Sequence, residues 1–587
     1  MKNLSIWFGI LLVVHQFFYL PNITDSFYTS KWGLFSISFC IIYAWYLKKS
    51  LHQKDLKISP ESKVLMLIGF LVFLISDIYH DSFYLIQTLG LCTFTYCMIY
   101  FLYRTKFDLS SVSGLIVSLL SLLCLLEVFG LAPFQGSTYH LSVFTGNPNL
   151  FAASLVFWFC IHKKNLSSKQ SLWASFAVLF LLILSKSRAG IIAFLLIEVF
   201  VYFKQNQKKG AVLIGGGLVL ASLFMIVNPY KVDEFSSLKI RKIEAKISYD
   251  ILKENLWLGV GQGNYRKAYF RQLETNKDTY SSYNDKPLLQ FIRLSEMSHF
   301  TPLSTLVSLG LPLGVLFLCL MGYFFKISYN LLEQNEFLAL FSLCLMSMTY
   351  YLFHFSIILI PALIIVAKGL SKDMIQIDGI SKKRLFPLII LFVWAGHWYS
   401  GLKYEFLSVK DYKSQINNPW NHGLLDHKLI VETLESKTVP NEKDFLMLVD
   451  QAHKKMPDPL TFYNVSKYFY LLGHHKKALE TLQKGINVLP SYASYYYARA
   501  LMKQDPIQAY LDYLLVLKID RKFVPAWKNA AIIQLETGYL QEGLYSIKNG
   551  LHFYSEKNQT KNLPADPYYH QLLQIQAAIM QKIKDKK

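Results

Sequence analysis

Long apolar runs separated by short polar linkers dominate this sequence, and they constrain its fold more than any other feature. A transmembrane helix needs about 20 mainly apolar residues, with roughly 17 as the lower end. Thirteen candidate spans lie near residues 4–20, 32–48, 63–79, 83–103, 111–133, 149–162, 170–185, 188–203, 211–228, 302–326, 337–353, 355–370 and 385–402. The sequence therefore predicts an all-α polytopic membrane protein with about 13 transmembrane helices, within a range of about 12–14.

Composition supports the same class. The chain of 587 residues is 53% hydrophobic and only 17% charged, which is too apolar for an ordinary soluble protein. The net charge of +21 would suggest a nucleic-acid partner if the basic residues formed a surface stripe, but most of them lie in the short linkers. We therefore expect no nucleic-acid partner and interpret the basic residues as topology signals.

The cysteines indicate neither disulfides nor a metal site. All seven lie inside apolar segments, where a thiol behaves as a small hydrophobic group. They are Cys40, Cys92, Cys97, Cys124, Cys160, Cys319 and Cys344. Their spacing contains no disulfide framework and no CxxC metal motif.

The basic linkers orient the chain. With the N-terminus in the cytoplasm, every even-numbered loop carries Lys or Arg, as cytoplasmic loops do. These loops are 48–57, 104–108, 163–169, 204–210, 326–336 and 368–384. The short odd-numbered loops are almost free of positive charge. The first apolar run lacks a small-residue cleavage site, so we interpret it as a retained span. Everything after about residue 402 is then expected outside.

Four segments follow from this pattern. They are a membrane core over 1–401 with a long outer loop at about 229–301, a linker and helical segment over 402–458, repeats over 459–557, and a C-terminal helix or tail over 558–587. The stretch 462–490 fits the tetratricopeptide template, with Gly473 at the turn between two helices. Further units near 495–520 and 526–550 complete a TPR-like array, which typically offers a docking surface for protein.

One charge is an exception to the rule that orients its neighbours. Arg188 lies in "SKSRAG" (185–190), the outer turn between the seventh and eighth spans, where positive charge is disfavoured. It could simply reach the lipid headgroups. Alternatively, its planar guanidinium binds an anion such as a diphosphate at the outer surface.

The outer loop carries a second group of candidates. In "NLWLGVGQGNYRKAYFRQ" (255–272) the glycines Gly259, Gly261 and Gly263 are spaced GxGxG, which does not fit a dinucleotide site. We expect them to permit a tight turn or a close approach to substrate. Three arginines of the loop could supply a second anion contact: Arg266, Arg271 and Arg293.

A histidine stands immediately before a span, in "MSHFTPL". A lone histidine at a membrane interface is usually structural, but its pKa near neutrality also suits His299 to accept a proton from an attacking hydroxyl. Paired with Arg188, it would serve a reaction in which a lipid diphosphate departs while a hydroxyl is activated.

Four motifs, in this order, resemble the O-antigen ligase and polymerase superfamily, which includes bacterial protein O-oligosaccharyltransferases. They are "FTGNPNLFAASL" (144–155), "SKSRAG" (185–190), "NLWLGVGQGNYR" (255–266) and "SHFTPLSTLVSLGLPLG" (298–314). The similarity covers roughly residues 60–370, and a C-terminal tetratricopeptide domain resembles a recurrent arrangement in this group. The sequence departs from the usual pattern at Leu256 and Phe300.

The resemblance implies transfer of a glycan from undecaprenyl diphosphate to an acceptor hydroxyl at the periplasmic face of a bacterial inner membrane. It implies inversion at the anomeric carbon, with no metal and no cofactor. The family's essential arginine and histidine correspond to Arg188 and His299, and Arg266 is the first choice for a further arginine. Asn147, Asn149 and Gly261 lie in the same motifs and are expected to contact substrate.

The sequence leaves three acceptors possible. They are a lipid A core sugar, the end of another glycan, as in a polymerase, and a Ser or Thr hydroxyl of a protein. The repeats favour a ligase over a polymerase, because a docking module suits capture of a macromolecule. A transporter or a non-catalytic envelope scaffold is the alternative from another class, although no inverted repeat is evident.

Overall fold

The computed structural model describes part of the 587-residue chain. The described residues are 2–17, 29–50, 55–57, 60–79, 85–129, 131, 148–204, 234–261, 264–265, 268–269, 271–272, 301–331, 333–347, 356–371, 375–377, 386–406, 430, 445, 447, 449, 459–488, 492–557 and 566–585. Within them the fold is all-α apart from two three-residue strands.

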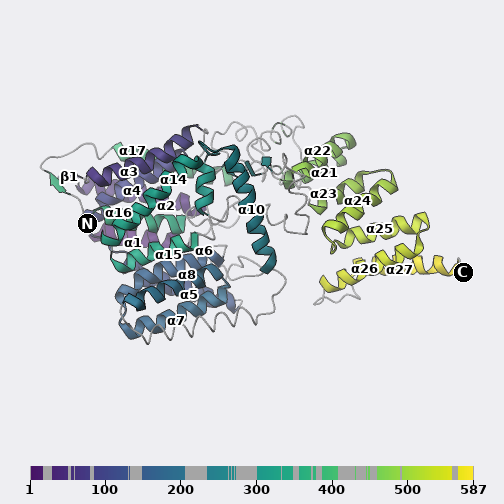
Figure 1. Ribbon diagram of the computed structural model, residues 1–587, viewed down its shortest axis with the longest axis horizontal. Coiled ribbons are helices and arrows are strands. Elements are labelled where there is room, and N and C mark those ends of the chain that lie inside the picture. The colour runs from purple at the N-terminus through teal and green to yellow at the C-terminus, as the bar shows by residue number, and fades with distance from the viewer. Residues whose placement is uncertain are drawn as a thin grey trace.

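The helices of the first 406 residues form one bundle, drawn on the left of Figure 1, with α10 beside it. They are α1 (Lys2–Phe17), α2 (Thr29–Ser50), α3 (Pro60–Tyr79), α4 (Leu85–Thr105), α5 (Ser110–Val128), α6 (Pro148–His162), α7 (Ser168–Ser185), α8 (Arg188–Lys204), α10 (Glu234–Glu254), α14 (Thr301–Leu331), α15 (Gln334–Ser347), α16 (Ser356–Ser371) and α17 (Phe386–Phe406). A helix overlaps each predicted span except the ninth, which lies outside the described residues.

Four of the described helices are long and apolar enough to cross a membrane: Leu85–Thr105, Ser110–Val128, Ser168–Ser185 and Pro302–Tyr323. Shorter apolar helices accompany them at Asn3–Phe17, Met66–Ser76, Ser356–Ser371 and Pro387–Tyr399. The total of thirteen spans stays a prediction.

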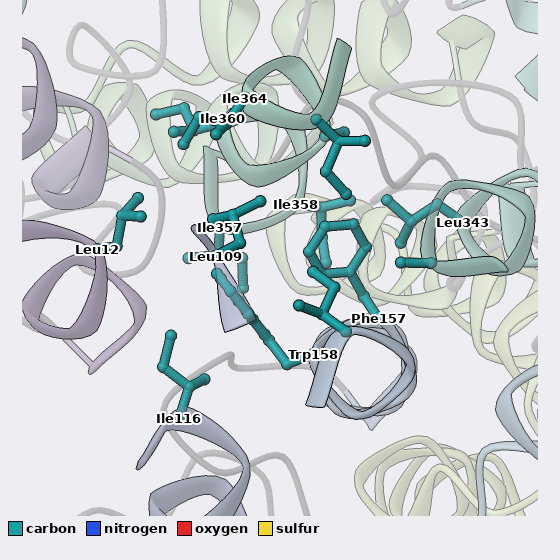
Figure 2. Packing of buried hydrophobic residues seen from close by; sticks show 14 of the residues in the cluster. Leu12, Leu109, Ile116, Phe157, Trp158, Leu343, Ile357, Ile358, Ile360 and Ile364 are labelled. Atoms are coloured by element: carbon teal, nitrogen blue, oxygen red, sulfur yellow. The ribbon is translucent and has the colours of Figure 1, made fainter. Parts of the chain in front are cut away.

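Helix α6 forms the centre of the bundle. Every residue of α6 from Leu150 to Ile161 is buried, and α5, α7, α8, α15 and α16 all pack against it. Figure 2 shows Phe157 and Trp158 of α6 surrounded by aliphatic side chains of neighbouring helices, among them Leu343 and Ile357. A helix that is apolar all round is stable only when it is enclosed, so α6 fixes the positions of the helices around it.

Five of the six loops predicted to be cytoplasmic lie at one end of this bundle. Strand β1 (Asp55–Lys57) pairs antiparallel with β2 (Ile375–Ile377), and this pairing joins loop 48–57 to loop 368–384. Ion pairs connect loops 104–108, 163–169 and 326–336 to one another and to loop 368–384. Lys164 contacts Asp108 at 3.1 Å and Glu333 at 2.9 Å, and Lys368 pairs with Asp108 and with Glu336. The loops are thus on one side, as the charge pattern predicts.

The Asp108 carboxyl is held charged at this end. Burial alone would raise its pKa, but hydrogen bonds from Ser110 and the charges of Lys368 and Lys164 hold the pKa of Asp108 well below its usual range. This carboxylate therefore stays ionised and able to pair with both lysines at any physiological pH.

The opposite end contains buried polar contacts centred on Gln16. The Gln16 side chain accepts a hydrogen bond from Ser154 of α6 at 3.0 Å and donates one to the Ile357 carbonyl of α16 at 3.1 Å. Its own backbone carbonyl accepts a hydrogen bond from Lys31 of α2 at 2.8 Å. Polar groups surrounded by lipid must find partners inside the protein, so these bonds tie α1, α2, α6 and α16 together.

The C-terminal array consists of paired helices drawn on the right of Figure 1. They are α21 (Pro459–Leu471), α22 (His475–Val488), α23 (Ala493–Met502), α24 (Pro506–Ile519), α25 (Val524–Thr537), α26 (Leu540–Lys557) and α27 (Pro567–Asp585). Gly473 has a φ of 80° between α21 and α22, and Gly538 a φ of 85° between α25 and α26. The turn predicted at Gly473 is therefore present.

The buried ion pair between Lys163 and Glu198 allows a test of how much such contacts stabilise the bundle. Their side chains are only 9% and 2% exposed, with Lys163 Nζ 2.7 Å from a Glu198 carboxylate oxygen. Replacing Lys163 by Met leaves a buried, unpaired carboxylate, which we expect to destabilise the fold by about 3–5 kcal/mol. The double variant Lys163→Met/Glu198→Leu should recover most of that loss. Thermal unfolding in detergent measures both; equal melting temperatures for wild type and the single variant would show that the pair contributes nothing.

Candidate functional site

The turn containing Arg188 has the form that its sequence predicts. Helix α7 ends at Ser185, and Lys186 closes it in the left-handed conformation, with φ 58° and ψ 21°. Helix α8 then begins at Arg188 itself, and both Lys186 and Arg188 are exposed. The apolar run 179–200 is thus two helices, and its central charges lie on the turn between them.

Ser187 links this turn to the centre of the bundle. Its hydroxyl accepts a hydrogen bond from the Gly190 amide at 3.3 Å, which caps α8, and donates one to Asn149 Oδ1 at 2.8 Å. Asn149 follows Pro148 at the start of α6, where proline suits the first helical position. Two motifs that are 38 residues apart in sequence therefore meet through one hydrogen bond beside Arg188.

Close packing brings α8 against α6 directly below this bond. A Cβ atom on Gly190 would lie 2.5 Å from the Cβ of Ala152, closer than two carbon atoms can approach. Only a glycine at 190 opposite a small residue at 152 permits this contact, the device by which membrane helices approach each other. The position of Arg188 relative to Asn149 depends on it.

This arrangement suits an anion. The N-terminus of a 17-residue helix carries partial positive charge on its amides. Arg188 adds a full positive charge and a planar donor fork, which fits phosphate oxygens in a bidentate manner. The exposed end of α8 therefore has the positive charge and the hydrogen-bond donors that a phosphate or diphosphate group requires.

The glycines of the outer loop contact α14 directly. Gly259 and Gly261 have φ values of 67° and 81°, and backbone hydrogen bonds connect Val260 to Val307 and Gly261 to Ser308, each at 2.9 Å. The predicted tight turn is thus present. The close approach that Gly259 permits is to the backbone of α14, because a Cβ there would lie 2.4 Å from the Gly310 amide nitrogen.

The predicted span 302–326 is helical but not continuous. Gly310 interrupts α14 with φ 78° and ψ 169°, a conformation that is essentially restricted to glycine. The Leu311 amide donates to the Leu256 carbonyl at 2.7 Å, so the freed backbone is satisfied by the loop. The residues before the break, including Val307, pack with α10, whereas the apolar helix continues after it.

The structure describes some of the predicted site residues and not others. Asn149 and Arg188 are brought together by the Ser187 contact, Gly261 is buried against α14, and Arg271 is exposed on the outer loop. The other candidates lie outside the described residues: Asn147, Gly263, Arg266, Arg293 and His299. Their roles stay predictions, as does the pairing of His299 with Arg188. Among the described residues, no group of three or more His, Cys, Asp or Glu side chains could hold a metal ion.

Three residues of this region were not singled out by the sequence. Ser187, Gly190 and Ala152 lie inside the quoted motifs, but a serine or a small residue in an apolar run is too common to indicate a contact. The signal that could have found them is a glycine at position 190, two residues after the arginine of the turn, together with the small residues of another predicted span.

Apolar helices that enclose a buried central helix, with a polar site at one end, define a multi-pass membrane protein. Residues 172–318 match the O-antigen ligase family. The matched interval contains the Arg188 turn, the glycine loop and the break in α14. This match supports a similarity of the chain to the O-antigen ligase superfamily. It also supports a glycosyltransferase-like role as a membrane glycan ligase or polymerase. No curated protein matches the sequence.

A substitution at Gly190 tests the contact between α6 and α8. Gly190→Ala should displace α8 and lower the melting temperature, because the new Cβ meets Ala152 at 2.5 Å. The double variant Gly190→Ala/Ala152→Gly removes the obstructing methyl group and should restore most of the lost stability. Thermal unfolding in detergent measures both. Equal melting temperatures of the single variant and wild type would contradict the contact.

The break at Gly310 can be tested against a matched glycine of the same helix. Gly310→Ala should destabilise the protein, since its Cβ would lie 2.4 Å from the Trp257 carbonyl oxygen and its φ is positive. Gly322 has open space around it, so Gly322→Ala should be neutral or slightly stabilising. Thermal unfolding of the two variants in detergent gives the comparison; similar melting temperatures would exclude a special role for Gly310.

Proposed function

We propose that this protein is a membrane glycan ligase that transfers an oligosaccharide or polysaccharide from undecaprenyl diphosphate to an acceptor hydroxyl at the periplasmic face. The observation that carries the proposal is Arg188, exposed at the start of α8 and fixed through Ser187 to Asn149. The turn lies within the segment that matches the O-antigen ligase family. An exposed arginine at a helix N-terminus, next to a serine that is hydrogen-bonded to α6, is suited to bind the diphosphate of such a donor.

The proposed reaction is a single displacement. His299 accepts the proton of the acceptor hydroxyl, and the oxygen attacks the anomeric carbon of the donor sugar. A new C–O bond forms while the bond from that carbon to the phosphate oxygen breaks on the opposite side, so the configuration inverts. The electron pair leaves with undecaprenyl diphosphate, whose negative charge Arg188 stabilises.

Other residues of the outer loop would complete the site. Arg266, Arg271 and Arg293 are candidates for further contacts to the diphosphate, with Arg266 first. Asn147, Asn149 and Gly261 would contact the donor or the acceptor. Because arginines neutralise the leaving charge, the proposed mechanism needs no metal ion and no cofactor.

The proposed location is a bacterial inner membrane, with the N-terminus in the cytoplasm and the array in the periplasm. The positive-inside rule supports this orientation. The strand pair and the ion pairs also gather the Lys-rich loops at one end of the bundle. We retain a membrane core over 1–401, a connecting segment over 402–458, TPR-like repeats over 459–557 and a tail over 558–587.

The two candidate functions within the superfamily, ligase and polymerase, differ in their acceptor. A lipid A core sugar or a protein hydroxyl would define a ligase, and the growing end of another glycan would define a polymerase. The array favours a ligase because a helical-repeat surface is suited to bind a protein partner or a macromolecular acceptor. A non-catalytic scaffold or a transporter is the alternative of another class.

Substitution of Arg188 and His299 tests the proposal. In a deletion strain complemented at matched protein levels, Arg188→Ala and His299→Ala should each lower transfer by roughly two orders of magnitude or more, because each removes a group that acts in the transition state. The lipid-linked glycan, quantified by mass spectrometry, should accumulate, and the glycan should disappear from one acceptor class.

Lys186→Gly provides the matched control, since it removes a neighbouring exposed charge while suiting the left-handed backbone at that position. It should retain most of the activity. If Arg188→Ala and His299→Ala both behave like wild type while the deletion has a defect, the transferase proposal is wrong and the scaffold or transporter takes its place.

A further inference from the structure

A single buried hydrophobic cluster, which we call the outer cluster, joins the outer loop to the C-terminal array. Its members come from α10, the glycine loop, the start of α14, the segment before α21, and the helices α21–α23. They are Ile243, Ile247, Ile251, Leu252, Val260, Tyr265, Tyr269, Val307, Ile430, Phe445, Val449, Phe462, Val465, Phe469, Ala478, Leu482, Ile486, Tyr495, Ala498 and Met502. Figure 1 shows α10 between the bundle and the array.

The loop side of the outer cluster is built on α10. Ile243, Ile247 and Ile251 recur every fourth residue, so they form one apolar stripe on a helix that also carries many charged residues. Tyr265 and Tyr269 are both fully buried, and the Tyr265 hydroxyl is 2.7 Å from the Ser248 hydroxyl of α10. The stretch that follows the glycine turn is thereby fixed to α10.

The array side is reached through the segment that connects α17 to α21. Ile430, Phe445 and Val449 are 0%, 2% and 7% exposed, and the Phe445 ring is centred 5.0 Å from that of Tyr468 on α21. Residues of a flexible tether would be exposed. These three are instead part of the core that the loop and the array share.

The distal helices of the array do not share this core. Buried residues of α24, α25, α26 and α27 form two separate clusters, one around Trp527 and one around Ile547. Among the residues that the structure describes, the array thus has a proximal part that is continuous with the outer loop and a distal part whose buried residues cluster with one another and with α23. In a helical-repeat array each unit is stabilised mainly by its neighbours, so the proximal part can support the loop independently of the distal part.

We infer that α21–α23, through Phe445 and Tyr468, are a positioning element for the outer loop and for the start of α14. The proximal array then stabilises the outer loop as part of the same folded unit. A partner that binds the array can therefore change the position of the loop through the outer cluster. The part of this inference that concerns catalysis rests on the proposed transferase function, because His299 lies two residues before the start of α14.

Hydrogen exchange of the full-length protein in lipid nanodiscs tests the inference without an activity assay. Phe445→Ala should increase exchange at least tenfold in peptides covering 243–254, 256–272 and 301–309, while α6 stays protected. Phe445→Leu keeps an apolar side chain and should give a smaller increase, which allows for an alanine variant that folds poorly. Ile507→Ala, at a 64% exposed position on α24, is the control and should change none of these peptides.

Faster exchange confined to 459–502, with the loop peptides unchanged in both Phe445 variants, would overturn the inference. Kinetics then separate positioning from substrate binding. Phe445→Ala should lower kcat several-fold and raise the KM for the lipid-linked donor less than Arg188→Ala does, because Arg188 lies on α8, outside the outer cluster, and only the proposed donor contacts of the outer loop are affected. Phe445→Leu should recover part of kcat. If the transferase proposal fails, the exchange result still decides whether the array supports the loop.

Discussion

Enclosure of α6 is the constraint on which the rest of the membrane core depends. Because its residues from Leu150 to Ile161 are buried, polar contacts to its neighbours can form only at its ends and through the few polar side chains it carries. One end meets the α8 turn through Asn149 and Ser187, and just beyond the other end Lys163 pairs with Glu198 of the same α8. Helix α8 is therefore held at its N-terminus and again in its second half, and these contacts of neighbouring residues set the position of the backbone at Arg188.

Much of this core could be predicted because hydropathy and charge are local properties. Apolar runs located the helices, and the basic linkers identified loops that β1, β2 and the Asp108 ion pairs gather at one end. Specific partners could not be predicted, since any small residue can permit a close helix contact. The meeting of Gly190 with Ala152 and the hydrogen bond from Ser187 to Asn149 both depend on three-dimensional packing. The break at Gly310 was equally hidden, because a single left-handed residue does not change the hydropathy of a span.

The glycine motif makes a close approach, as expected, but to a different part of the molecule than the sequence suggested. Gly259 was expected to permit a tight turn or a close approach to a substrate, and its backbone does adopt a positive φ. The close approach is instead to Gly310 of α14. Two glycines from distant motifs thus allow the outer loop and α14 to exchange backbone hydrogen bonds, which satisfies the groups that the break in α14 exposes.

These contacts divide the proposed site between two layers. Arg188 belongs to the membrane core through α6 and α8, whereas His299 precedes the part of α14 that packs with α10 in the outer cluster. On the proposed mechanism, the arginine that binds the donor diphosphate is thus attached to the membrane core, whereas the chain that follows the proposed base enters the outer cluster at the start of α14. Reactions of this kind require their groups to be placed to within a fraction of an ångström. We infer that the outer cluster, which extends into the helices α21–α23, supplies this placement for the start of α14.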